Sequence, residues 1–239
     1  MAEVLAPEKK EGLFSKGNKK LLTDPLDDNN PITVQVLGIC SALAVTTLVF
    51  PSIVITIAVI FVCAFSNLIT SLLRKSIPSQ VRMIVQLIIV ATLVTVVELT
   101  LKAVQYEVYD QLTVFIGLII TNCIVMGRLE AFAMANTPWK SFLDGVGNGV
   151  GYGVILIMVS IVRELFGKGS LLAGTPLEMK MIGATPEYWI NTTADGWQGI
   201  FFGWYQNNNL MVLPAAAMFL IGIIIWIQRS RNTKLVDIS

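Results

Sequence analysis

The sequence contains three cysteines and no histidine, and these two counts bound its chemistry. Without histidine the chain lacks the commonest metal ligand, the usual haem ligand and the usual acid–base group near neutral pH. Serine and cysteine triads that depend on histidine are excluded as well. Cys40, Cys63 and Cys123 are too few, and too apolar in context, for a secreted disulfide framework. A lone membrane cysteine is commonly a small apolar side chain, and we interpret Cys63 in this way.

The surroundings of Cys40 and Cys123 differ from an ordinary apolar run. Gly38 and Ser41 flank Cys40, and Asn122 immediately precedes Cys123. Polar and helix-weakening residues are tolerated within a membrane where the backbone finds other partners or lines a cavity. At 1.5 Å per residue the two thiols lie about 13 Å and about 7 Å from the same membrane face, so they can meet. This pattern favours a site, while composition alone also allows two small apolar side chains.

Two carboxylates fall within apolar segments. Glu98 precedes Lys102 by four residues, which is the spacing of an ion pair on one helix. Asp144 precedes a glycine-rich segment and is placed to act as a helix N-cap. Intramembrane acids also mark ion paths, so Glu98 and Asp144 are candidate residues of a cation pathway.

The segment after Asp144 repeats glycine at every second position. On a helix these glycines form two neighbouring small-residue faces, which are typical of close helix packing. The alternative is that they open the helix beside a bulky group at the centre of the bundle. The first face comprises Gly145, Gly149 and Gly153, and the second comprises Gly147 and Gly151.

The composition shows which elements position these residues. Of 239 residues, 54% are hydrophobic and 14% are charged, against about 25% charged in soluble domains. The chain is therefore an integral membrane protein. Windows with at most one charge predict six helices near the length of about 20 residues that spans a bilayer: 32–50, 51–73, 83–101, 111–127, 145–162 and 210–228. Pro51 divides the first two.

An odd number of helices per half predicts an all-α membrane protein of two inverted three-helix repeats, with helices 1 and 4 interrupted. Residues 1–31 form a polar tail, 32–228 the membrane domain with a long outer loop at 164–209, and 229–239 a second tail. Asn29 to Pro31 are a candidate cap for the first helix. Thirteen lysines and arginines fall on one side and four on the other, so both termini are expected to be cytoplasmic.

Three segments together resemble a known family. They are Asn29-Asn30-Pro31 with residues 35–47, residues 117–134 around Thr121-Asn122-Cys123, and residues 144–153. The chain resembles the family formed by the D-type and E-type membrane subunits of the Na+-translocating NADH:quinone reductase and the corresponding subunits of Rnf complexes. The cytoplasmic N-terminus favours the D type, because the E type is similar but inverted.

The resemblance implies a role for the cysteines. In this family the two homologous subunits each contribute two intramembrane cysteines to one [2Fe-2S] cluster, and the matching positions here are Cys40 and Cys123. The implied protein is an electron-carrying subunit of a redox-driven sodium pump in the bacterial inner membrane, with NADH and flavins on other subunits of the complex. It is part of an enzyme and is not catalytic alone.

Three alternatives to this function remain: a corresponding subunit of an Rnf ferredoxin:NAD oxidoreductase, a secondary transporter of inverted repeats, and a purely structural membrane subunit. The transporter and the structural subunit give the cysteines no role.

Overall fold

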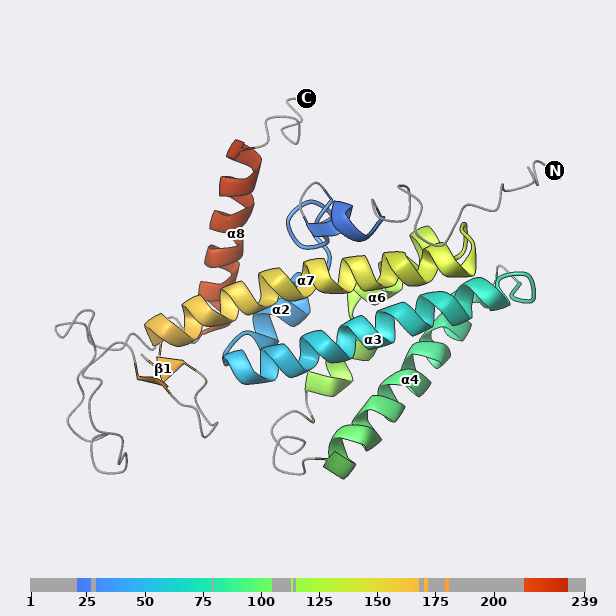
Figure 1. Ribbon diagram of the computed structural model, residues 1–239, viewed down its shortest axis with the longest axis horizontal. Coiled ribbons are helices and arrows are strands. Elements are labelled where there is room, and N and C mark those ends of the chain that lie inside the picture. The colour runs from blue at the N-terminus through green and yellow to red at the C-terminus, as the bar shows by residue number, and fades with distance from the viewer. Residues whose placement is uncertain are drawn as a thin grey trace.

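The computed structural model describes residues 21–26, 29–78, 80–104, 113, 115–167, 170–171, 179–180 and 213–231. Helices account for most of them (Figure 1): η1 Asp24–Leu26, α2 Ile39–Val45, α3 Val49–Leu73, α4 Arg82–Val104, α6 Cys123–Arg128, the π-helix η2 Leu129–Ala133, α7 Pro138–Gly167 and α8 Pro214–Arg231. One short antiparallel pair, β1 Ser170–Leu171 with β2 Met179–Lys180, lies in the segment predicted as an outer loop. Most of that loop, the first 20 residues and residues 232–239 lie outside the described residues.

Four segments in the described part of the chain are long and apolar enough to cross a membrane. They are Val49–Leu73, Arg82–Ala103, Phe115–Ala133 and Pro138–Gly167, and α8 is a shorter apolar helix. These segments confirm a helical membrane protein. They match the second, third, fourth and fifth predicted spans, although the fifth begins seven residues earlier than expected.

The first predicted span, 32–50, is not one continuous helix. Only the seven residues of α2 are helical before α3 begins at Val49, and seven residues reach only about 10 Å. Val36 and Gly38 both have positive φ, at 58° and 81°, so the backbone turns immediately before α2. The prediction that Pro51 separates two helices is wrong. Pro51 lies in the first turn of α3, where proline removes no helical hydrogen bond.

The fourth predicted span, 111–127, is interrupted at Thr121 and Asn122 and ends later than expected. Residues 115–120 are helical, the chain leaves the helix for two residues, and α6 then starts at Cys123. The Asn122 side chain caps α6 by accepting a hydrogen bond from the Ile124 N–H. The helical path continues through η2 to Ala133, six residues beyond the predicted end.

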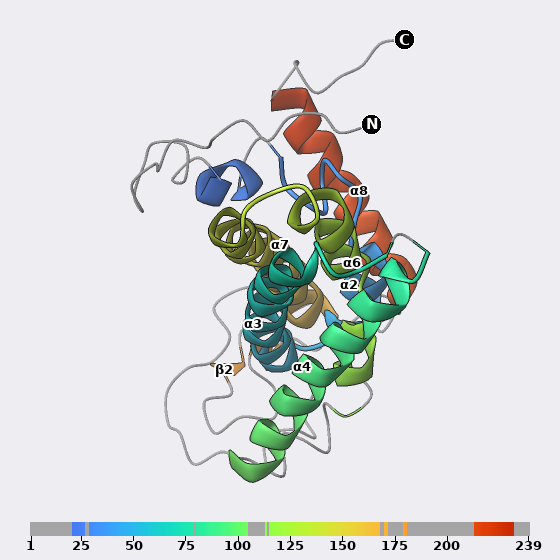
Figure 2. The same ribbon diagram turned by 90° about the vertical axis from the view of Figure 1, so that its right-hand side faces the viewer.

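The centre of the molecule is the pair α3 and α7, which lie side by side and run antiparallel (Figures 1 and 2). The first glycine face of α7 makes this approach possible. A Cβ on Gly145 would lie 2.9 Å from Ala64 Cα, and one on Gly149 would lie 2.9 Å from Ile60 Cα. The interpretation of this face as a close-packing surface is therefore confirmed.

The second glycine face of α7 packs against the segment that precedes α2. A Cβ on Gly147 would lie 2.7 Å from the Leu21 carbonyl oxygen, and one on Gly151 would overlap the Pro25 carbonyl. Asn30, which is 2% exposed, donates from Nδ2 to the Gly151 carbonyl oxygen at 3.1 Å. Its Oδ1 accepts from the Ile32 N–H, so Asn30 stabilises a turn. The prediction that Asn29 to Pro31 cap a membrane-spanning helix is therefore wrong.

Candidate functional site

The two cysteines from the interrupted segments lie next to each other. Cys40 Sγ and Cys123 Sγ are 3.6 Å apart although 83 residues separate them in the chain. Cys40 is exposed and Cys123 is partly exposed, so the thiol pair opens onto the surface of this chain. Cys63 is fully buried within α3. The structure thus brings together the two cysteines that the sequence singled out. The third cysteine lies on α3, with its side chain buried in the core.

Both thiols lie at the start of a short helix. Cys40 is the second residue of α2, and Cys123 is the first residue of α6. The Gly38 N–H donates to Cys123 Sγ at 3.0 Å, so a backbone amide from one segment supports the sulfur of the other. A backbone N–H of this kind is a hydrogen-bond donor to a sulfur that binds metals as the thiolate.

Gly38 makes this arrangement possible through its backbone conformation. It precedes α2 with φ 81° and ψ 9°, a left-handed conformation that costs roughly 1–2 kcal/mol for most other residues. A Cβ at this position would also lie 2.8 Å from Cε2 of Tyr152. The turn that directs Cys40 toward Cys123 therefore requires glycine.

Tyr152 is a site residue that the sequence did not reveal. Its side chain is fully buried, its hydroxyl lies 2.8 Å from Ser41 Oγ, and the side chain of Asn122 lies close to the same hydroxyl. Ser41 follows Cys40 and Asn122 precedes Cys123, so one tyrosine lies beside both cysteine-bearing segments. The sequence signal for it was a lone aromatic residue between two glycines of the repeat.

The far end of α2 is held by a buried arginine. Arg163 is 1% exposed and donates from Nη1 to the Leu43 carbonyl oxygen at 3.3 Å and to Thr46 Oγ1 at 2.5 Å. A second nitrogen, Nη2, donates to the carbonyl oxygen of Leu213 at 3.2 Å, next to the start of α8. A cation at the C-terminus of a helix is favourable because carbonyl groups there have no helical partner.

The next residue, Glu164, stabilises the first turn of α3, on the other side of the break between α2 and α3. Glu164 is also 1% exposed, and its Oε2 accepts from the Val49 N–H at 2.6 Å, at the start of α3. Arg163 and Glu164 thus satisfy backbone groups on opposite sides of the break. In the sequence Arg163 was one of the four basic residues on the side opposite the termini. An adjacent acid–base pair at the end of an apolar span was the signal for this role.

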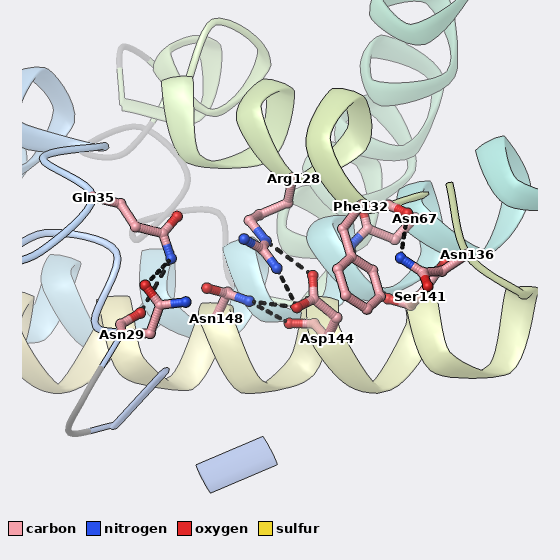
Figure 3. A network of polar contacts seen from close by, with 9 residues as sticks. All are labelled: Asn29, Gln35, Asn67, Arg128, Phe132, Asn136, Ser141, Asp144 and Asn148. Carbon is pink, nitrogen blue, oxygen red and sulfur yellow. Dashed lines mark hydrogen bonds and ion pairs between the residues drawn. The ribbon is translucent and has the colours of Figure 1, made fainter. Parts of the chain in front are cut away.

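Asp144 lies inside α7 and is not its N-cap, which corrects the structural role that the sequence suggested. Arg128 donates to Asp144 Oδ2 at 2.9 Å from Nε and pairs with Oδ1 through Nη2, and Asn148 Nδ2 donates to Oδ1 at 3.0 Å (Figure 3). The Asp144 side chain is 3% exposed. This carboxylate joins α7 to α6.

Glu98, the other candidate acid, lies on α4 near the C-terminal end of that helix. It is partly buried and takes part in an interaction of its own.

Asp144, Asn148 and Tyr152 share a third face of α7, at intervals of four residues. This face points toward α6 and α2, whereas the two glycine faces receive α3 and residues 21–25. One helix therefore organises all the segments around the cysteines. Its glycines set how closely the neighbours approach, and its polar residues set their register.

The described residues bring together two side chains of a type that binds soft metals. Within the part of the chain that the structure describes, no group of three or more His, Cys, Asp or Glu side chains could hold a metal ion. The chain offers two adjacent sulfurs on its surface instead. Soft metals and iron–sulfur clusters are the groups that thiolates prefer, and a [2Fe-2S] cluster takes four of them.

The fold and the thiol pair define a helical multi-pass membrane protein that presents two surface thiols at interruptions in its helices. Residues 18–225 match the model of the family described as Rnf-Nqr subunit, membrane protein, and the chain belongs to this family. It is 52% identical over 223 residues to the D-type subunit of the Na(+)-translocating NADH-quinone reductase of Shewanella halifaxensis, covering 93% of this chain and 97% of the relative. The proteins with the same name from Yersinia enterocolitica and Proteus mirabilis are 51% and 52% identical, each over 93% of this chain and 98% of the relative.

Proposed function

We propose that this chain is the D-type membrane subunit of a Na+-translocating NADH:quinone reductase. The observation that carries the proposal is the 3.6 Å contact between Cys40 and Cys123, found in a chain about half identical to proteins of that name. The chain works as part of the enzyme and carries electrons within the membrane. NADH and flavins belong to other subunits of the complex.

Cys40 and Cys123 fit two of the four ligand positions of a [2Fe-2S] cluster. Both sulfurs face the same surface, one of them accepts a backbone N–H, and no histidine exists in the chain to replace a missing thiolate. Such a cluster supplies one-electron transfer at membrane depth. The residues of this chain hold its two sulfurs in place and exclude water from the inner side of the site.

A second subunit must provide the remaining two thiolates. Because Cys40 is exposed on this chain, a homologous subunit of opposite orientation is able to approach it with a matching pair. The internal arrangement supports such an inverted partner. One half comprises α2, α3 and α4, the other comprises residues 115–133, α7 and α8, and the long helices of the two halves run antiparallel.

The excess of lysine and arginine on one side supports cytoplasmic N- and C-termini in a bacterial inner membrane. Cys123 lies near the middle of its span, Phe115–Ala133, so the thiol pair lies well inside the membrane. Modification of single introduced cysteines in the two tails by a membrane-impermeant thiol reagent tests the orientation. Labelling of intact cells from outside at either tail would contradict the proposed topology.

The cluster is tested by iron content and electron paramagnetic resonance of the purified complex. Cys40→Ser and Cys123→Ser should each abolish the [2Fe-2S] signal, whereas the matched control Cys63→Ala should keep it. A complex that is fully active and free of iron in both serine variants would indicate the secondary transporter. Loss of iron in Cys63→Ala alone would overturn the ligand assignment.

The electron donor and acceptor separate the two complexes of the family. Complete complex should oxidise NADH and reduce quinone with a sodium-dependent rate. Ferredoxin-dependent reduction of NAD+ without quinone reductase activity would identify the Rnf alternative instead.

Glu98 and Asp144 are proposed to bracket a cation path, and the sodium dependence of turnover tests this. Glu98→Gln and Asp144→Asn keep size while removing charge, so an ion path predicts a raised sodium half-saturation in the folded complex. The pairing of Asp144 with both Arg128 and Asn148 favours a structural role for this acid. Unchanged half-saturation in both variants would end the ion-path proposal.

A further inference from the structure

The side chain of Tyr152, on α7, lies against the segment of Cys40 and close to the segment of Cys123. Its hydroxyl hydrogen-bonds Ser41, one residue after Cys40, and lies close to the side chain of Asn122, one residue before Cys123. Its ring lies against Gly38, whose N–H donates to Cys123 Sγ. The residues beside the buried hydroxyl, Ser41 and Asn122, are therefore the chain neighbours of the two cysteines.

The directions of these hydrogen bonds form a connected chain. Ser41 Oγ donates to the Gly38 carbonyl oxygen at 3.0 Å, so the Tyr152 hydroxyl is the donor to Ser41 Oγ at 2.8 Å. The peptide N–H of the same Gly38 reaches the sulfur of Cys123 at 3.0 Å. The orientation of this glycine is thus fixed from three sides: by the Tyr152 ring, by Ser41 and by the sulfur.

We infer that Tyr152 is a positioning residue that sets the distance between the two thiols and the aim of the Gly38 N–H at Cys123. The inference rests on the proposed function in that the thiols are taken as cluster ligands. Tyr152 does not reach the sulfurs itself, and acts through Ser41, Asn122 and Gly38. Because groups linked in one buried network restrain one another, removing the hydroxyl loosens both segments together.

Tyr152→Phe tests the inference because it keeps the ring against Gly38 and removes only the hydroxyl. In the purified complex the variant should retain its iron, and its electron paramagnetic resonance spectrum and midpoint potential should both change. Iron release to a chelator should accelerate about two- to tenfold, the ratio expected for one buried hydrogen bond. Ser41→Ala should cause a similar change, and combining it with Tyr152→Phe should add little, because both substitutions break the same link.

Ser160→Ala is the matched control. Ser160 lies two turns further along α7 and its hydroxyl hydrogen-bonds Ser52 of α3 at 2.5 Å. Ser52 meets α2 at the Val45 carbonyl oxygen, at the end of that helix opposite Cys40. This variant also loses one buried hydroxyl contact, but its spectrum and iron release should match the wild type. A Tyr152→Phe complex identical to wild type would overturn the inference, as would a Ser160→Ala complex with the same changes.

A separate measurement distinguishes failure of this inference from failure of the proposed function. If the wild-type complex contains no iron, the proposed function fails, and the free thiols are then oxidised in membranes with copper phenanthroline. Their 3.6 Å separation predicts rapid disulfide formation between Cys40 and Cys123. Tyr152→Phe should slow it several-fold and Ser160→Ala should not; equal rates in all three proteins would refute the positioning role.

Discussion

The close contact between the two central helices makes Gly145→Ala a sensitive test of the fold. The added Cβ would lie 2.8 Å from the Cys63 carbonyl oxygen and 2.9 Å from Ala64 Cα, whereas ordinary van der Waals contact begins at 3.4 Å. Both contacted atoms belong to the backbone of α3, so no side-chain rotation relieves them. Helices α3 and α7 must move apart by roughly 0.5 Å, which is a backbone shift of the overpacking kind.

The free energy follows from two opposing effects. Overpacking of this kind costs about 1–3 kcal/mol. Alanine is a better helix former than glycine by about 1 kcal/mol, which offsets part of this loss. The expected net destabilisation is about 1–2 kcal/mol.

Gly222→Ala is the matched control, because a Cβ at Gly222 in α8 would meet no atom within 4 Å. It receives the gain in helix propensity without the clash. The assay is the fraction of purified complex that stays monodisperse by size-exclusion chromatography after heating. Gly145→Ala should lose stability relative to the wild type, and Gly222→Ala should equal or exceed it. Equal thermal stability of the two variants would refute the close-packing argument.

Three further substitutions test the buried polar groups by the same thermal assay. Asp144→Ala leaves the Arg128 guanidinium, whose side chain is 13% exposed, without its carboxylate and should cost about 2–4 kcal/mol, below the range for a fully buried pair. An added Arg128→Met should recover most of this loss, and a double variant as unstable as the single one would contradict a stabilising ion pair. Glu164→Gln keeps an acceptor for the Val49 N–H but removes the charge, so we expect the complex to lose about 1 kcal/mol of stability. Unchanged stability would show that the charge is irrelevant. Asn122→Ala removes the cap of α6 and should cost about 1 kcal/mol, whereas Asn122→Asp should retain most of the stability.

The membrane class and most of the helices were predictable because they depend on local composition. A charge-free window of about 20 residues has few alternatives to a membrane helix, since backbone groups in lipid must be satisfied within the segment. For residues 32–50 the charge-free window predicted one span and the sequence also predicted an interruption in it, which is present, but the position of the turn was not predictable. There the chain turns at Val36 and Gly38 and leaves only α2 helical, and hydropathy does not detect such turns.

The pairing of Cys40 with Cys123 was predictable in outline from depth and from flanking residues. The resemblance to a known family then supplied their implied role. The sequence did not reveal which residues hold the two cysteine-bearing segments in place. Tyr152 and Arg163 act on α2 from a helix more than 100 residues away in the chain, through contacts with Ser41 and Thr46.

By itself the sequence determined that this is a helical membrane protein with two distinctive cysteines, because hydrophobicity and residue type are properties of each segment alone. Only the tertiary structure decided that α7 presents glycines to α3 and to residues 21–25 and polar side chains to α2 and α6. It also decided that Asp144 pairs with Arg128 and is not a helix cap. The physical reason is that a buried polar group must find a partner, and the partner it finds depends on which distant segments the folded chain places beside it.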